Sequence, residues 1–291
     1  MKFFIVGASG LVGGSFVKHL KEKGHEVVGT HLTLPTDDTV YFDALDLDNP
    51  QNFDVKNYQP DVVVHCAALA NVDYCEANED ESYEKTVSTA KNLVELCKQL
   101  NAGIVYTSTD YVFDGTSGPY VETDDVNPLS VYGKHKLLVE ELIQKELPDN
   151  GIILRICGVY GDEIRGKNFI IRIINDVKDN REWTMNLPQD QYATPVWAMD
   201  VAGAAVLLAE DKKSGIYHIG STDFMNRVQL AHKVLSYLPN HKCTVIGKNT
   251  NELGQAAARP LMSGHISEKF LSEYPDYRFS NVDDYMRYKT S

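Results

Sequence analysis

The chain has 291 residues, of which 43% are apolar and 24% are charged, which is the composition of a soluble globular protein with a substantial core. Its formal net charge of -13 opposes non-specific binding to nucleic acid or to an anionic membrane. The five cysteines are dispersed and form no CxxC pair, which favours a reduced, cytoplasmic protein without a structural zinc site.

Strand-like apolar runs recur through the first half of the chain, with helical spacing between them. They are KFFIV (2–6), EVVGT (26–30), DVVVH (61–65), GIVYT (103–107) and GIILR (151–155). The first run is too short for a signal peptide or a membrane span. Continuous Val/Ile runs are typical of strands covered on both faces. The alternation predicts an α/β fold of the Rossmann type, with a doubly wound parallel sheet.

The first strand is followed by GASGLVGG, whose glycines have a GxxGxxG spacing at the start of a helix. Glycines there allow a tight turn and let the backbone approach a pyrophosphate, whose charge is met by the helix N-terminus. Between a strand and a helix, this motif predicts a dinucleotide site; helix–sheet packing alone is the less favoured explanation. The expected cofactor contacts in the loop are Gly7, Ser9, Gly10, Leu11, Val12 and Gly13.

The second strand ends in Thr30 and His31, which are expected to contact the cofactor, and it lacks the carboxylate that usually holds the ribose of NAD. This leaves room for a 2′-phosphate and favours NADP(H) over NAD(H), although no arginine follows the strand. Asp46 and Leu47, after the third strand, are candidates for contacts with the adenosine. An exposed turn is an equally good explanation of Asp46.

The stretch VYGKHK places Tyr132 and Lys136 four residues apart in a predicted helix, so both side chains lie on one face. A phenol titrates near ~10 in water, and a neighbouring ammonium stabilises its anion. The spacing alone is also common on solvated helix faces.

After Arg155 the alternation becomes less regular, with a helix predicted within 160–180 and a strand and a helix within 183–210. From about Tyr217 the chain mixes short strands, helices and proline turns. We expect an NAD(P)-binding domain at 1–160 and a smaller, mainly substrate-binding lobe at 161–291, with the segment at about 192–210 returning to the main sheet.

The motifs together resemble the extended short-chain dehydrogenase/reductases: GASGLVGG, HCAALANVDYCEAN (65–78), TSTDYVFDG (107–115) and VYGKHK. Within that superfamily, STDYVFDG, VDYCE, DQYATPV (190–196) and ARPLMS (258–263) resemble the dTDP-4-dehydrorhamnose reductase, or RmlD-like, branch. The resemblance runs in order over nearly the whole chain.

The resemblance implies a catalytic triad of Thr109, Tyr132 and Lys136, with Ser108 as the alternative hydroxyl because TST leaves the register open by one residue. In the implied reduction, a hydride passes from the nicotinamide to a sugar keto carbon and Tyr132 donates a proton to its oxygen. Lys136 is expected to bind the nicotinamide ribose and to lower the tyrosine pKa, and Thr109 to orient the carbonyl oxygen.

Other positions follow from the same resemblance. The family's usual asparagine is replaced by Thr86, and Arg155 is expected to form a structural pair. Arg259 is a candidate for a diphosphate contact, with a surface role as the alternative. The further expected cofactor contacts are Ala67, Ala68 and Thr107, and the expected substrate contacts are Thr109, Asp110, Val112, Gln191, Thr194 and Arg259.

The implied function is reduction of a nucleotide-linked 4-keto-6-deoxy sugar. Dehydration is disfavoured because Tyr111 stands where sugar-nucleotide dehydratases carry a glutamate after the aspartate. A sugar-nucleotide epimerase and a non-catalytic NADP-binding subunit resembling the regulatory subunit of methionine adenosyltransferase are the alternatives. The expected partner is the nucleotide sugar, and a homodimer stays open. No metal site is expected, since the acidic run at 76–84 is explained as a solvated helix start.

Overall fold

A parallel sheet of seven strands forms the centre of the molecule, in a computed structural model that describes all 291 residues. The strand order is β3-β2-β1-β4-β5-β6-β9, so the chain first builds outward on one side of β1 and then on the other. The strands are β1 (Lys2–Val6), β2 (Glu26–His31), β3 (Thr39–Tyr41), β4 (Val62–His65), β5 (Gly103–Thr109), β6 (Gly151–Ile156) and β9 (Gly215–Ile219). The expected Rossmann-type α/β fold is confirmed.

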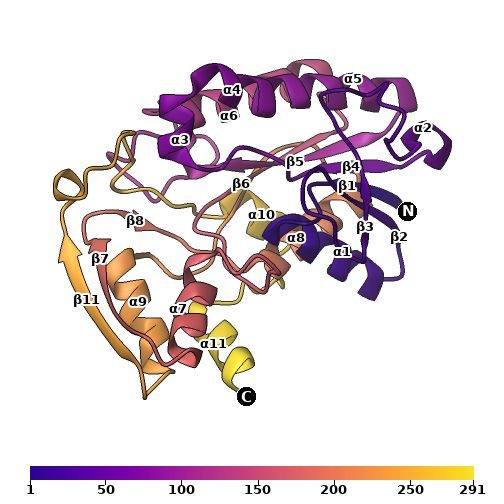
Figure 1. Cartoon of the computed structure of the whole chain (residues 1–291). Coiled ribbons are helices and arrows are strands. Elements are labelled where there is room, and N and C mark those ends of the chain that lie inside the picture. Colours follow the sequence, from indigo (N-terminus) through magenta and orange to yellow (C-terminus); the bar gives the residue numbers. More distant parts are fainter.

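Helices cover both faces of this sheet, as Figure 1 shows. The layer on one face contains α3 (Val72–Ala77), α4 (Glu79–Tyr83), a π-helical turn (Glu84–Ser88), α5 (Thr89–Leu100) and α6 (Val131–Glu146), and the layer on the other contains α1 (Leu11–Glu22) and α8 (Ala198–Glu210). Successive side chains of a strand point to opposite faces. On β1, Phe3 and Ile5 therefore join the apolar cluster of α1 and α8, while Phe4 and Val6 join that of α5 and α6.

The chain returns to the main sheet after leaving it at the end of β6. Helix α8 packs on α1, and β9 then pairs with β6 as a parallel edge strand. The return is therefore longer than the expected segment 192–210, because the short run GIYHI finds an open sheet edge beside β6. Within that segment, β8 (Tyr192–Ala193) pairs with β10 (Met225–Asn226) outside the main sheet.

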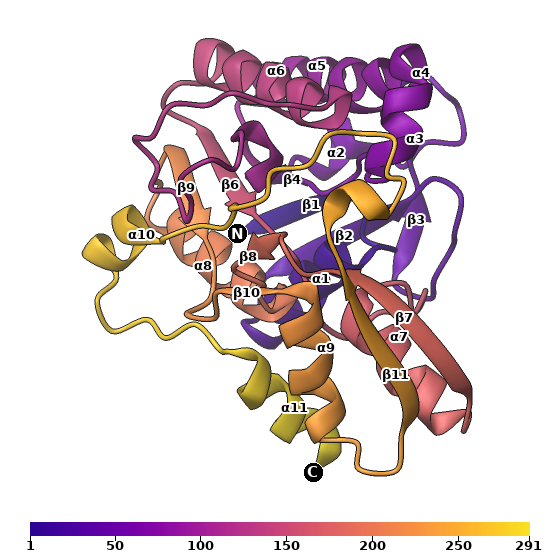
Figure 2. The ribbon, with the colours of Figure 1, turned by 90° about the vertical axis from the view of Figure 1, so that its left-hand side faces the viewer.

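A smaller lobe packs below the sheet, with its own apolar cluster (Figure 2). Its helices are α7 (Phe169–Lys178), α9 (Arg227–Ser236) and α11 (Val282–Thr290), beside the parallel pair β7 (Glu182–Pro188) and β11 (Lys242–Lys248). The remaining short helices are α2 (Val55–Tyr58), α10 (Glu268–Glu273) and the 3₁₀ turns Asp110–Val112 and Thr250–Glu252. None of the helices has the length and apolar character needed to cross a membrane.

The C-terminal part of this lobe also contacts the first half of the chain. The backbone N–H of Gly118 donates to Met262 O at 3.1 Å, and that of Tyr120 donates to Gly264 O at 3.0 Å. The segment around 258–265 therefore lies against the loop that follows β5, at the carboxyl end of the sheet. In open α/β sheets this is the end at which ligands bind.

Candidate active site

The glycine loop between β1 and α1 is folded too tightly for larger residues. Gly7 has φ +92°, and a Cβ there would lie 2.9 Å from the backbone nitrogen of Ala67. A Cβ on Gly13 would lie 2.4 Å from the carbonyl oxygen of Gly7. Gly10 occupies the N-cap of α1 without a side-chain cap, so no side chain of the cap position covers the first N–H groups of the helix. Such an open helix start suits an anionic ligand.

A hollow of about 180 Å³ lies beside this loop, at the ends of β1 and β2. It is lined by the expected residues Gly7, Thr30, Ala67 and Ala68, and the Thr30 hydroxyl accepts a 3.4 Å hydrogen bond from the Gly7 N–H. Its mostly apolar wall suits an adenine ring. Lys85, which the sequence reasoning did not single out, also lines it.

Three further expected cofactor contacts, Asp46, Leu47 and His31, lie outside this hollow. Asp46 is exposed, and Leu47 packs against the core. Asp43, Ala44 and Leu45 line the hollow instead of Asp46 and Leu47. The Asp43 N–H donates to Asn52 Oδ1 at 2.6 Å, and this bond turns the chain before it reaches Asp46. The His31 ring does not line the hollow; its Nδ1 hydrogen-bonds the Thr39 hydroxyl at 2.9 Å.

A second cavity, of about 370 Å³, opens at the carboxyl ends of β4, β5 and β6. It brings together eight residues expected at the site, among them the alternative hydroxyl of Ser108: Val12, Ala68, Thr107, Ser108, Thr109, Asp110, Tyr132 and Lys136. The rest of the wall is formed by Cys66, Ala70, Val72, Tyr111 and the stretch from Ile156 to Val159. The residues from Ile156 to Val159 were not predicted from the sequence. They begin at the last residue of β6, and strand ends at this edge of the sheet are the usual place for ligands.

Helix α6 places Tyr132 and Lys136 at this cavity. Ser130 caps the helix by accepting a 3.2 Å hydrogen bond from the Gly133 N–H. A Cβ on Gly133 would lie only 2.2 Å from the Tyr111 carbonyl oxygen. The glycine between the two candidate residues thus allows the first turn of α6 to approach the end of β5. The Tyr132 ring meets the Tyr111 ring edge-on, with centroids 5.6 Å apart.

Lys136 is almost fully buried, and its ammonium is held from two sides. Nζ donates a 2.7 Å hydrogen bond to the Thr107 carbonyl oxygen and lies 4.6 Å from the centre of the Tyr106 ring. Burial lowers the lysine pKa to about 8, against the raising effect of Cys66 and Glu140. This group is therefore still mostly charged at neutral pH.

The expected lowering of the Tyr132 pKa is not found. Burial raises it above the ordinary value, since a phenolate is poorly solvated there, and the Thr109 hydroxyl opposes this only in part. The Lys136 ammonium lies 5.9 Å from the centre of the Tyr132 ring and is directed to Thr107. Tyr132 consequently holds its proton at neutral pH.

The structure separates the two candidate hydroxyls of the TST sequence. The Ser108 hydroxyl donates to Glu140, which forms a buried ion pair with Arg155 at 2.7 Å. The Thr109 hydroxyl accepts from the Tyr111 N–H at 3.2 Å and donates to Asp110 at 3.2 Å, next to Tyr132. Thr109 is therefore the hydroxyl on the side of Tyr132, and Arg155 has the structural pairing expected for it.

The expected substrate residues do not all reach this cavity. Asp110 lines it, and burial raises its pKa, while the Ser263 hydroxyl donates to it at 2.6 Å. Val112 instead points into a closed cluster with Phe113 and Tyr120. A 3₁₀ turn begins at Asp110, and it rotates the valine away from the cavity.

The remaining three expected substrate residues belong to the second lobe. Thr194 is buried, and its hydroxyl accepts a 2.8 Å hydrogen bond from the His265 N–H. The Gln191 amide donates to Thr250 and Gln255, at 3.0 and 2.7 Å.

Arg259 forms a two-point pair with Asp73 of α3, with distances of 2.9 and 2.8 Å. This pair lowers the Asp73 pKa and joins the second lobe to the first.

Thr86, in the place of the family asparagine, lies in the π-helical turn before α5. It is buried, and its hydroxyl has no hydrogen-bond partner. A hydroxyl in this position cannot make the several contacts of a carboxamide.

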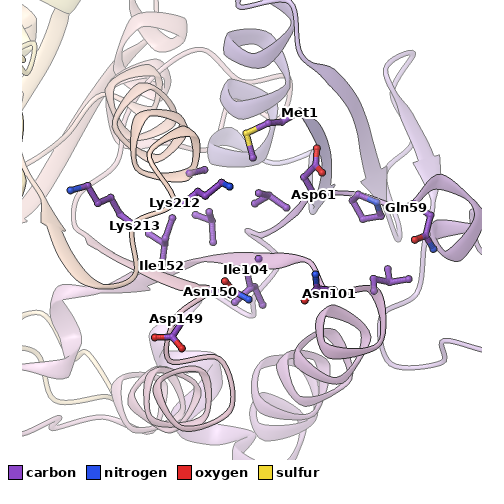
Figure 3. A pocket seen from close by; sticks show the side chains of 16 residues that line it. Met1, Gln59, Asp61, Asn101, Ile104, Asp149, Asn150, Ile152, Lys212 and Lys213 are labelled. Atoms are coloured by element: carbon purple, nitrogen blue, oxygen red, sulfur yellow. The ribbon is translucent and has the colours of Figure 1, made fainter.

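A further hollow, of about 540 Å³, lies at the opposite end of the sheet. Figure 3 shows it between Met1, Asp61, Asn101, Asp149 and Lys212, where strands β4, β5 and β6 begin. It is remote from the glycine loop and from the Tyr132 cavity. Ligands of open α/β sheets bind at the carboxyl ends of the strands, so this hollow at their amino ends is not the expected place for the chemistry.

The residues present fit a dinucleotide cofactor. The tight glycine loop, the open start of α1, the apolar hollow at Thr30 and the buried Lys136 follow one another along the carboxyl edge of the sheet. Residues 1–280 match the family described as the RmlD substrate binding domain. The chain belongs to this family. Its expected place in the RmlD-like branch of the extended short-chain dehydrogenase/reductases is thereby confirmed.

Similar proteins include reductases and a subunit of methionine adenosyltransferase. The chain is 32% identical over 219 residues to dTDP-4-keto-6-deoxy-D-glucose reductase of Streptomyces niveus, which covers 75% of the chain and 72% of that relative. It is 29% identical over 231 residues to methionine adenosyltransferase 2 subunit beta of Xenopus tropicalis; the match covers 78% of the chain and 69% of that relative. The structure of dTDP-4-dehydrorhamnose reductase from Bacillus anthracis in complex with NADP matches with a TM-score of 0.86 and 27% identity. The match covers 99% of the chain and 97% of that structure.

The names of these relatives, and the cofactor bound in one of them, are compared with the expected enzyme class and cofactor. A reductase name occurs for a relative that matches three quarters of the chain, and a bound NADP occurs in a structure that matches nearly all of it. At the level of the family, the expected NAD(P)-dependent oxidoreductase is confirmed, and the NADP of the Bacillus anthracis structure agrees with the expected cofactor.

Proposed function

We propose that the chain is an NADPH-dependent reductase of a nucleotide-linked 4-keto-6-deoxy sugar, similar to dTDP-4-dehydrorhamnose reductase. The observation that carries the proposal is the cavity in which Thr109, Tyr132 and Lys136 meet at the carboxyl edge of the sheet. A proton donor, a cation and a hydroxyl beside a dinucleotide loop are the protein groups that reduction of a ketone requires.

The cofactor would be held by the chain's own carboxyl-edge residues. The glycine loop and the start of α1 suit the pyrophosphate, the hollow at Thr30 suits the adenosine, and Lys136 suits the nicotinamide ribose. When bound, NADPH supplies the hydride for the keto carbon.

Tyr132 is the proposed proton donor. Because its pKa is raised, the phenol carries a proton at neutral pH, and the oxygen of a ketone under reduction becomes basic enough to take it. The charge of Lys136 favours the phenolate that is left behind. The Thr109 hydroxyl, which donates to Asp110 in this structure, would turn its single proton to the same carbonyl oxygen and fix its direction.

The second lobe is proposed to bind the nucleotide part of the substrate. Asp110 lines the cavity and is hydrogen-bonded to Ser263 of that lobe. Arg259 keeps its Nε–H without an acceptor despite the pair with Asp73, so it stays the candidate for a diphosphate contact. Gln191 stays a candidate for the sugar. Val112 and Thr194 are not carried forward, because neither lines the cavity: Val112 packs in its closed cluster, and the Thr194 hydroxyl accepts from the His265 N–H.

The alternatives are less well supported. Tyr111 packs against Tyr132 where a dehydratase needs a glutamate. The end of β2 has no carboxylate to hold the ribose of the tightly bound NAD of an epimerase. A non-catalytic subunit is compatible with the similarity to methionine adenosyltransferase 2 subunit beta, but it would not need the Thr109, Tyr132 and Lys136 grouping.

The direct test is to follow the absorbance of reduced nicotinamide when the purified protein meets a dTDP-4-keto-6-deoxy sugar, with NADPH and NADH in parallel. We expect turnover that is faster with NADPH. Tyr132→Phe should lower kcat by roughly 10³-fold or more while the cofactor still binds. Tyr288→Phe is the matched control, since Tyr288 is 51% exposed on the last helix.

Two results would speak against the proposal. Turnover that survives Tyr132→Phe unchanged would refute the proton donor. Saturable NADPH binding without turnover on any keto sugar, together with tight binding to a partner enzyme, would favour a regulatory subunit.

A further inference from the structure

An arginine from the second half of the chain contacts the glycine loop. Arg165 Nη2 donates a hydrogen bond to Ser9 Oγ at 3.4 Å, although the two residues are 156 positions apart. Arg165 belongs to the connection between β6 and α7, and its side chain makes no other hydrogen bond and no ion pair. An unpaired guanidinium is thus placed at the start of α1.

The connection between β6 and α7 lies against the glycine loop, and hydrogen bonds within the connection fix its conformation. Residues Ala8, Ser9 and Gly10 form one side of a depression of about 440 Å³, and residues 162–164 form another side. The Glu163 carboxylate accepts hydrogen bonds from Lys167 N at 2.8 Å and from Asn168 Nδ2 at 2.9 Å. These bonds fix the turn that carries Arg165.

The acidic residues of the depression do not neutralise Arg165. Asp162 accepts from Tyr285 at 2.9 Å and pairs with Lys289 at 2.6 Å. Glu163 is used by its own turn, as described above, and Asp38 pairs with Lys21. The fourth, Glu22, lies at the far end of α1, roughly 18 Å along the helix from its start.

We propose that Arg165, together with Ser9, binds a phosphate of the dinucleotide cofactor. This rests on the proposed function and deepens it. A guanidinium forms strong charge-assisted hydrogen bonds to phosphate, and the open start of α1 attracts the same group. The end of β2 provides no arginine for the cofactor, and Arg165 supplies one from a part of the chain outside the expected dinucleotide-binding domain.

Both the pyrophosphate and the 2′-phosphate of NADPH are phosphates that this part of the fold can receive. The two are distinguished by comparing NADPH with NADH, which lacks the 2′-phosphate. If Arg165 binds the pyrophosphate, its loss weakens both cofactors. If it binds the 2′-phosphate, its loss weakens NADPH alone.

The experiment is a titration of the purified full chain with NADPH and with NADH, read by cofactor fluorescence, without sugar substrate. We expect Arg165→Ala to weaken binding of NADPH roughly 10- to 100-fold, the size of a lost charge-assisted contact. Ser9→Ala should have a smaller effect in the same direction. Arg181→Ala is the matched control: it removes the same charge from a 63% exposed arginine that pairs only with Asp176 and Asp179.

The outcomes separate this inference from the function on which it rests. Arg165→Ala with unchanged affinity for both dinucleotides would overturn the inference and leave the reductase proposal in place. An equal loss in Arg181→Ala would also overturn it, because the effect would then be one of net charge. A wild-type chain that binds neither dinucleotide would overturn both. Thermal unfolding without cofactor should be the same in wild type and Arg165→Ala, since the side chain is exposed.

Discussion

Lys136 Nζ donates a 2.7 Å hydrogen bond to the backbone carbonyl of Thr107, two residues before Thr109 on the same strand. The bond joins α6 to β5 at the point where the candidate acid and the candidate hydroxyl meet. It also holds a cation inside the protein, since Lys136 is 3% exposed and its pKa is lowered to about 8 by burial.

This buried charge costs stability, so Lys136→Met should produce a more stable but inactive protein. A pKa lowered from 10.5 to about 8 corresponds to a cost of about 3 kcal/mol at neutral pH. The unpaired Thr107 carbonyl offsets about 1 kcal/mol of the gain, leaving about 2 kcal/mol. Urea unfolding of both proteins at pH 7 measures this gain in the free energy of unfolding. The free-energy cost of burying the charged lysine is fully present below pH 8 and fades between about pH 8 and 10.5. The stability gain of Lys136→Met should therefore shrink at pH 10. A variant destabilised at pH 7 would contradict the prediction.

The same pKa predicts how the reaction depends on pH. We expect kcat/KM to fall as the pH rises through about 8, because Lys136 then loses the charge that favours the Tyr132 phenolate. Tyr132 itself stays protonated over this range, since its pKa lies above the ordinary value of 10. The profile should be measured with saturating NADPH and with cofactor affinity recorded at each pH. A rate that stays level up to pH 9.5 would show that the lysine charge is not needed.

The separation of Ser108 from Thr109 predicts different results for the two hydroxyls. Thr109→Val should lower kcat roughly 10²- to 10³-fold, because it removes the hydroxyl beside Tyr132. Ser108→Ala should change kcat by only a few-fold and lower the unfolding free energy by about 1 kcal/mol, since its hydroxyl bonds to Glu140. Thr109→Ser, which keeps a hydroxyl, is the control. The opposite ranking of the two losses would assign the catalytic role to Ser108.

The sequence predicts the parts of this site that depend on local pattern. Buried apolar runs located β1, β2, β4, β5 and β6 to within two residues, because a strand covered on both faces needs such a run. The glycine loop and the Tyr132 and Lys136 spacing belong to single strand–turn–helix and helix segments. Their geometry follows from short-range rules.

What the sequence leaves open depends on the relative placement of distant segments. Successive residues of a strand point to opposite faces, so the choice between Ser108 and Thr109 needs the position of α6 relative to β5. The contact of Arg165 with Ser9 depends on a connection that crosses between lobes. The edge strand β9 was missed because its short run carries no pattern that identifies a sheet partner.

The buried Glu140–Arg155 pair should contribute to stability only as an intact pair. Both side chains are at most 3% exposed, and the carboxylate also accepts the Ser108 hydroxyl. Glu140→Leu leaves the Arg155 charge buried without a partner, so we expect a loss of about 3–5 kcal/mol in urea unfolding.

The double variant Glu140→Leu with Arg155→Met removes both charges and replaces them by apolar groups of similar size. It should recover most of the stability that Glu140→Leu loses, because neither ion is then left desolvated. His218, whose pKa is lowered to about 3 by burial first and by Arg155 second, gives an independent readout. In the double variant its pKa should rise by the part due to Arg155, which imidazole titration by NMR measures. A double variant as unstable as the single one would mean that the pair stabilises the fold by its own attraction.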